Sequence, residues 1–247
     1  MFCAKLLALA VSFAALAEDA PQVVSSPDGR VTCEFFLEDG RPSANVSFCG
    51  RHVFRSALGI ECGKVKVVKS ETRTIRGTWK PVWGFKSEYP ENYAELAVKL
   101  IREGREGKEP SVETICIRCY DEGFAVRTKF VIGTYHVGAV EGERTNWRFA
   151  DGAAAWGITA TEGTFPADPI PVANMSGSGW RMPLTLCIPG GTYASVFEAH
   201  VENYPRSYIL LPPLSALFRT ILIGLTAVAK AFRITGSHIA LLILRIP

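Results

Sequence analysis

The segment TYASVFEAHVENYP, residues 192–205, holds the side chains that are best suited to carry out chemistry. Its polar and apolar residues alternate, which predicts a β-strand. On that strand Glu198, His200 and Glu202 would share one face. Three ionisable groups on one face of a strand in an apolar neighbourhood suggest that Glu198 points toward a binding partner. The same spacing also fits an ordinary solvated sheet face, and spacing alone favours that second interpretation.

Two cysteines, Cys116 and Cys119, have the separation found in redox motifs and zinc sites. They lie in ETICIRCYDEGFAVRTKF, which predicts a hairpin that turns at residues 121–123. Residues i and i+3 of a strand face opposite sides, so the two thiols should point apart. The sequence has neither a second such pair nor a histidine pair at zinc-finger spacing. We therefore expect buried or singly paired cysteines, and the six cysteines after residue 17 allow about 15 pairings.

Trp79 and Trp83, in TWKPVWG, form a third candidate site. Flat aromatic rings stack well on sugar rings, but paired tryptophans in a β-domain more often anchor a core or an interface. The sequence favours a core or interface role and leaves sugar contact open.

The elements that must position these side chains belong to an all-β domain. Short alternating segments are separated by turns: RVTCEFFLE alternates, Asp39-Gly40 turns the chain, and PSANVSF alternates again. LTLCIPGGTYASVFEAHV predicts another hairpin, with Gly190-Gly191 at its turn. No convincing amphipathic helix precedes residue 210. A chain of 247 residues with 48% apolar residues can bury the core of a large β-sandwich.

Residues 1–17 are typical of a cleaved secretory signal peptide. Lys5 supplies the positive start, LLALAVSFAALA is a short apolar run, and Ala15-Leu16-Ala17 offers a cleavage site. The run is too short to cross a bilayer comfortably. We therefore predict an exported protein, secreted or periplasmic.

The charge is unevenly distributed along the chain. Five basic residues and no acidic residue follow Tyr204, so the formal charge of +3 becomes −2 for residues 1–203. No basic stripe interleaved with aromatic residues is present, so nucleic acid is not an expected partner.

Residues 212–247 are apolar and lack both acidic residues and clear turn signals. Arg219 and Lys230 leave too short an uninterrupted stretch for a membrane span. One interpretation is an apolar helix packed on a sheet. The other is a segment foreign to the fold, from a shifted reading frame or a truncated gene. The expected organisation is thus a β-sandwich over residues 23–211 and an atypical tail over residues 212–247.

An ordered series of motifs identifies a family resemblance. The motifs are SPDGRV, SALGIE, TWKPVWGF, ENYAEL, RCYDEGFAVR, NWRFADGAAAW, MPLTL and YASVFEAHVENYP. Over residues 23–207 they resemble the N-terminal domain of glycoside hydrolase family 97. The members of this family are exported bacterial α-glucosidases and α-galactosidases. The resemblance implies a β-super-sandwich similar to the galactose-mutarotase fold. In the family a catalytic (β/α) barrel and a small β-domain follow it.

The resemblance also bears on the candidate sites. The family's catalytic carboxylates lie on the barrel, so no catalytic residue is assigned here, the substrate-binding residues stay unknown, and the chain alone is expected to be inactive. The family's sandwich supplies a glutamate, from a His-Glu-Ala stretch, to a calcium ion in the barrel's active site. The matching stretch here is Phe197-Glu198-Ala199, which implies Glu198 as a calcium ligand whose partner ligands lie on the barrel. Nothing after Leu211 fits the family pattern, which favours the frameshift or truncation interpretation of the tail.

The leading hypothesis is a carbohydrate-associated, non-catalytic N-terminal domain of a secreted glycoside hydrolase. The alternatives are a stand-alone carbohydrate-binding module for α-glycosides and a partner-docking sandwich that self-associates through its barrel-facing surface. A mutarotase-like epimerase would need a general acid and a general base, for which only His136, His200 and Glu198 are visible candidates.

Overall fold

The computed structural model describes residues 20–59, 63–102, 110–130, 145–159, 162–175, 177–202, 207–211, 218–222 and 237–245. The expected signal peptide and His136 lie outside these residues.

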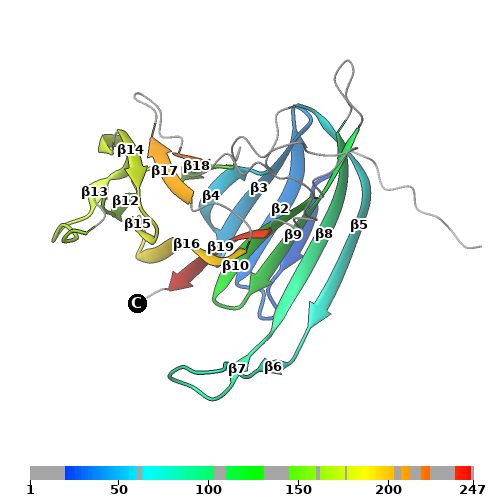
Figure 1. Ribbon diagram of the computed structural model, residues 1–247, viewed down its shortest axis with the longest axis horizontal. Coiled ribbons are helices and arrows are strands. Elements are labelled where there is room, and N and C mark those ends of the chain that lie inside the picture. Colours follow the sequence, from blue (N-terminus) through cyan, green and yellow to red (C-terminus); the bar gives the residue numbers. More distant parts are fainter. Residues whose placement is uncertain are drawn as a thin grey trace, which may run out of the picture.

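The described chain folds into two large antiparallel sheets that pack face to face (Figure 1). The first has eight strands, in the order β1 (Gln22–Ser25), β2 (Val31–Glu38), β3 (Arg41–Phe48), β4 (Arg51–Ala57), β11 (Asn146–Phe149), β18 (Phe218–Leu222), β17 (Ser207–Leu211) and β14 (Gly177–Trp180). The second has nine, in the order β13 (Ile170–Pro171), β12 (Ala154–Trp156), β15 (Leu184–Ile188), β16 (Thr192–Glu202), β19 (Ser237–Arg245), β10 (Gly123–Phe130), β9 (Ser111–Tyr120), β8 (Tyr93–Arg102) and β5 (Val65–Ile75).

Two smaller elements complete the described part. Strands β6 (Thr78–Trp79) and β7 (Tyr89–Pro90) pair with each other between β5 and β8, and η1 (Val172–Asn174) is a single 3-10 turn. The expected all-β sandwich is therefore confirmed.

Two-residue turns fix the register of the first hairpins. Asp39 and Gly40 join β2 to β3 with φ values of 52° and 75°, and Cys49 and Gly50 join β3 to β4 with 49° and 74°. Positive φ at both positions is the geometry whose twist matches the twist of the flanking strands. Glycine reaches it without strain, and aspartate tolerates it better than most residues.

Alternation along the strands decides which side chains form the core. On β2 the side chains of Val31, Cys33 and Phe35 are almost fully buried, as the sequence pattern predicts. Aromatic rings pack against one another in this core. The ring of Phe54 on β4 lies 5.0 Å from that of Trp147 on β11 and 5.6 Å from that of Phe124 on β10, edge to face in both cases. Phe124 comes from the other sheet, so Phe54 ties the two layers together.

A buried ion pair closes one end of this core. Arg102 Nη2 on β8 lies 2.6 Å from Glu113 Oε1 on β9, and Arg102 Nη1 donates to the carbonyl oxygen of Gly63 at 2.7 Å. Both charged side chains are less than a tenth exposed, at 8% and 6%. Each charge thus has a partner in a place where water is scarce.

The described residues after Leu211 are strands, so the apolar helix, one of the two interpretations of the tail, is wrong for them. β18 pairs with β11 and β17, and β19 pairs with β10 and β16, which brings this part of the tail into both sheets. A short apolar run such as IALLIL fits a buried strand or a buried helix equally well, so periodicity could not separate the two. An origin in a shifted reading frame stays a prediction about the gene.

We predict that Phe54→Ala destabilises the sandwich by about 3–5 kcal/mol, because it removes a large buried ring and leaves a cavity between the sheets. Urea unfolding followed by tryptophan fluorescence measures this change. Val82→Ala is the control, since Val82 is 98% exposed and its truncation should leave stability unchanged. Equal stability of the two variants would contradict the assignment of Phe54 to the core.

Candidate functional site

The outer face of the nine-stranded sheet, the face turned away from the core, carries a cluster of charged and aromatic side chains. Along β8, Leu96 and Val98 face the core, whereas Tyr93 and Glu95 occupy the alternate positions. The neighbouring β9 places Arg118 directly opposite Glu95. Although it lies on the outer face, Glu95 is only 4% exposed.

Two arginines hold the carboxylate of Glu95. Arg73 on β5 approaches Oε1, with Nε at 2.7 Å and Nη2 at 2.6 Å, and Arg118 Nε lies 2.6 Å from Oε2. The side chains of Arg73 and Arg118 are 58% and 30% exposed. A carboxylate with both oxygens saturated by guanidinium groups is fixed in place, which suits a positioning role and not proton transfer.

Aromatic rings extend this cluster. The guanidinium carbon of Arg118 lies 4.4 Å from the ring centre of Tyr93, whose ring is 5.0 Å from that of Tyr120. Burial lowers the pKa of Arg118, but its hydrogen bonds to Tyr120 and Glu95 outweigh burial and raise the pKa overall. Burial raises the pKa of Tyr93, so its hydroxyl stays protonated at neutral pH. The cluster therefore presents fixed cationic and hydroxyl groups.

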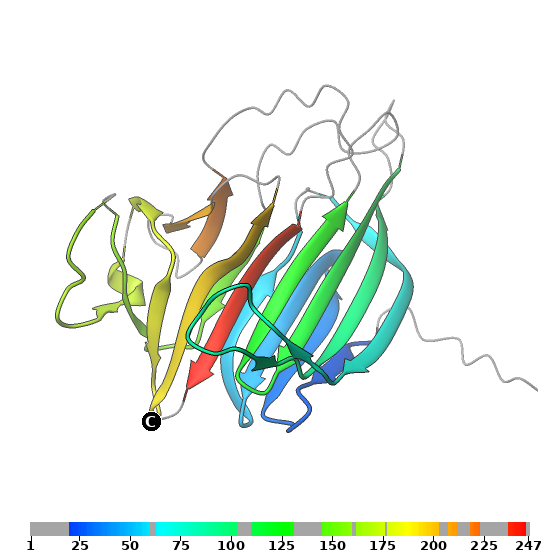
Figure 2. The same cartoon turned by 60° about the horizontal axis from the view of Figure 1, so that its bottom comes forward.

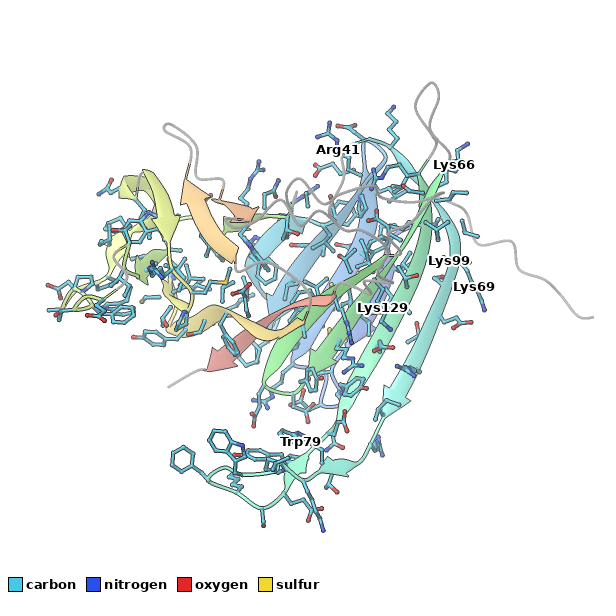
Figure 3. The ribbon with its side chains drawn as sticks, in the orientation of Figure 1. Arg41, Lys66, Lys69, Trp79, Lys99 and Lys129 are labelled. Carbon is cyan, nitrogen blue, oxygen red and sulfur yellow. The ribbon has the colours of Figure 1, made fainter. Side chains whose placement is uncertain are left out.

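The ribbon formed by β6, β7 and the loop between them overhangs this face. It leaves the sheet at the ends of β5 and β8 and returns in front of the outer face (Figures 1 and 2). Trp79 stacks on Tyr89 with ring centres 5.4 Å apart and an interplanar angle of 19°, and Figure 3 shows Trp79 on the ribbon away from the sheet. Trp83 and Phe85 on the loop are almost entirely exposed, at 88% and 106%. The expected core role for the two tryptophans is therefore wrong, because both rings are exposed and Trp79 is held by local stacking on Tyr89. An interface role and contact with a sugar both remain open alternatives.

Glu198 lies on β16, where the strand is irregular. The buried residues Ala194 and Val196 face the core, and Glu198 takes the next position of that alternation and is half-buried. Glu198 pairs with Ala240 and His200 with Ile239, so Ala199 is an extra residue without a partner. Such a bulge bends a strand and re-aims the side chains beside it. The expected regular alternation of Glu198, His200 and Glu202 on one face is therefore interrupted at Ala199.

The calcium expectation can be tested against the surroundings of Glu198. Calcium takes six to eight oxygen ligands, and a carboxylate supplies at most two. Within the part of the chain that the structure describes, no group of three or more His, Cys, Asp or Glu side chains could hold a metal ion. These residues do not fit a complete calcium site, and Glu198 can contribute no more than the two oxygens of its carboxylate.

The paired cysteines point apart, as their spacing predicts. Cys119 is fully buried and belongs to the core between the sheets. Cys116 lies on the outer face, next to the position of Arg127 on β10, and burial raises the pKa of its thiol. The two thiols therefore cannot share a metal ion or form a redox pair with each other.

The described chain is a two-sheet, antiparallel β-sandwich. Its candidate functional side chains lie on the outer face of one sheet, around Glu95, and beside one strand bulge, at Glu198. The chain belongs to the Glycosyl-hydrolase 97 N-terminal family, whose model matches residues 24–221. The match extends ten residues beyond the boundary expected at residue 211 and includes most of β18.

Solved structures share the fold of this chain. A glycoside hydrolase family 97 enzyme from Pseudoalteromonas sp. strain K8, solved with panose and also with acarbose, superposes with a TM-score of 0.77 at 19% identity. A β-arabinopyranosidase superposes with a TM-score of 0.74 at 19% identity. Each match covers 91% of this chain but only 35% of the Pseudoalteromonas enzyme and 40% of the arabinopyranosidase. At this identity the likeness shows the fold alone.

No curated protein matches the chain significantly. Among the described residues, no helix is long and apolar enough to cross a membrane.

Glu95→Gln should destabilise the protein by about 2 kcal/mol, because Arg118 loses its charged partner in a poorly solvated place. The matched control is Glu71→Gln on β5, which breaks the exposed ion pair between Lys69 and Glu71 and should not change stability measurably. Thermal and urea unfolding of both variants measure the difference. A Glu95→Gln variant as stable as the control would show that the cluster does not fix the outer face.

Proposed function

We propose that this chain is the non-catalytic N-terminal sandwich of a secreted glycoside hydrolase, and that it takes part in carbohydrate handling without cleaving glycosidic bonds itself. The observation that carries the proposal is the family match over residues 24–221. The share of 35–40% that the chain covers in its structural neighbours supports it, because more than half of each neighbour lies outside the matched region.

The buried carboxylates of the sandwich also support a non-catalytic role. Glycoside hydrolysis uses two carboxyl groups that flank the scissile bond, about 5–9.5 Å apart. Glu95 and Glu113, the buried acidic residues, are both neutralised by arginines. They also lie on opposite faces of one sheet, since Glu95 is on the outer face and Glu113 pairs with the core-facing Leu100. They cannot flank one bond.

The purified chain should therefore not hydrolyse p-nitrophenyl α-glucoside or α-galactoside above the rate without protein, with or without added calcium. Release of p-nitrophenol is followed by absorbance. Turnover that disappears on chelation of calcium would overturn the proposal, because it would place a complete catalytic site in this chain.

We propose that Glu198 contributes one carboxylate to a calcium ion whose other ligands come from outside this chain. The Phe197-Glu198-Ala199 stretch, its resemblance to the family's His-Glu-Ala, and the bulge at Ala199 support this role. One carboxylate leaves most of the coordination shell to water, so the chain alone should bind calcium no more tightly than about 1 mM.

Calorimetric titration of the full chain with calcium chloride tests this incomplete ligand set. The expected titration is flat at micromolar protein. Micromolar affinity that Glu198→Gln abolishes would show that the chain holds a complete site, contrary to the proposal. The matched control is Glu202→Gln, which changes a glutamate on the same strand, three residues after the bulged Ala199.

A stand-alone carbohydrate-binding module is the second candidate, and the exposure of the ribbon favours it. Trp83 is 88% exposed and Trp79 is 49% exposed, so both rings are accessible to a sugar face. The stack of Trp79 on Tyr89 holds one of these rings in a fixed orientation. Sugar-binding aromatic residues work in this way, because a fixed ring loses little entropy on binding.

In this case the chain binds maltotriose or panose in calorimetry, and Trp83→Ala weakens the affinity about tenfold, since one lost stacking contact is worth about 1.4 kcal/mol. Phe165→Ala is the control, because Phe165 is an exposed aromatic residue outside the ribbon. A flat titration of the unaltered chain would exclude the module. Light scattering on the same samples tests the remaining alternative, a sandwich that self-associates through its barrel-facing surface.

A further inference from the structure

Two buried thiols lie in the core between the sheets, one from each sheet. Cys33 belongs to β2 of the eight-stranded sheet and Cys119 to β9 of the nine-stranded sheet. Both side chains are 0% exposed and belong to the core. Strand β9 packs across the core against both β1 and β2, so the two cysteines approach from facing layers.

The contacts of Cys119 place its sulfur beside Cys33. The thiol of Cys119 donates to the carbonyl oxygen of Val24 on β1, with 3.5 Å between sulfur and oxygen. Val24 is the direct partner of Cys33 in the β1–β2 ladder. The backbone N–H of Cys33 also donates a hydrogen bond to the Cys119 sulfur, which places the two residues in contact across the core.

The other described cysteines have different surroundings. Cys49 is exposed in the turn between β3 and β4, Cys116 lies on the outer face, and Cys187 is half-buried on β15. None of these three thiols belongs to the core cluster. Among the described residues, Cys33 and Cys119 are thus the two thiols that share one environment.

We propose that Cys33 and Cys119 form a disulfide that joins the two sheets when the chain folds in the presence of a low-molecular-weight disulfide such as oxidised glutathione. The thiolate of one cysteine attacks the glutathione disulfide, forms a mixed disulfide and releases one glutathione thiolate. The second cysteine then attacks the sulfur of the first and releases the second glutathione. The protein loses two hydrogen atoms, and one glutathione disulfide is reduced to two glutathione molecules.

Burial determines when this reaction can occur. Burial raises the pKa of Cys119 to about 12 and raises that of Cys33 well above its ordinary value. Thiolates are the reactive species, so the closed sandwich contains almost none of them at neutral pH. The bond therefore forms before the sheets close, and once formed it is shielded from reducing agents. An already folded, reduced chain resists oxidation for the same reason.

The test compares full chain refolded from denaturant with a glutathione redox buffer and with dithiothreitol. After alkylation of free thiols and proteolysis, mass spectrometry should show the peptides of Cys33 and Cys119 linked and lighter by two hydrogen atoms. The oxidised protein should melt about 10 °C higher than the reduced protein. Folded, reduced chain incubated in the same oxidising buffer should remain largely alkylatable after denaturation.

Variants assign the effect to this pair. Cys33→Ala and Cys119→Ala should each abolish the difference in melting temperature between oxidised and reduced protein, whereas Cys49→Ala should retain it. Peptide mapping of the unaltered chain decides the matter even if a core variant fails to fold. Full alkylation of both cysteines after oxidative refolding, or a link from either one to a different cysteine, would overturn the proposal. Neither result bears on the glycosidase assignment, which the hydrolysis and binding measurements test.

Discussion

The burial of one face of each sheet is the constraint on which the rest of this protein depends. Two antiparallel sheets can exclude water only if alternate residues of nearly every strand are apolar, and the inner positions of β2, β8 and β9 obey this rule. Polar chemistry is thereby moved to the outer faces, the ends of strands and the irregular positions. Glu95 lies on an outer face, Glu198 lies beside the bulge of β16, and the exposed tryptophans lie on the ribbon beyond the sheet. The buried pair of Arg102 and Glu113 closes an end of the core.

Much of the local structure could be predicted from sequence because it depends on neighbouring residues. Asp39-Gly40 reveals a tight turn through its backbone preferences, and the alternation in RVTCEFFLE reveals both the strand and its buried face. Cys116 and Cys119 diverge for the same local reason. The tail differs, since an apolar run has no period to interpret, and only its partners β10 and β16 make residues 237–245 a strand.

The outer-face cluster was missed in the sequence because distant strands create it. Arg73, Glu95 and Arg118 come from three strands, and nothing local in ENYAEL or RCYDEGFAVR marks them as partners. The register of β5, β8 and β9 is the missing signal. When these three strands are aligned as two consecutive hairpins, Glu95 on β8 lies opposite Arg73 on β5 and Arg118 on β9. The bulge at Ala199 is equally invisible, since one extra residue leaves no compositional trace. Family resemblance, and not spacing, is what singles out Glu198.

The position of β19 has a consequence for biosynthesis. This strand is the last described in the sequence, yet it lies inside the nine-stranded sheet, between β16 and β10. Until residues 237–245 have left the ribosome, β10 and β16 each expose a row of unpaired amide and carbonyl groups. The edge of β10 is therefore open from the synthesis of residue 130, and that of β16 from residue 202, until β19 inserts between them. During this interval the nascent chain is prone to aggregate through its unpaired strand edges.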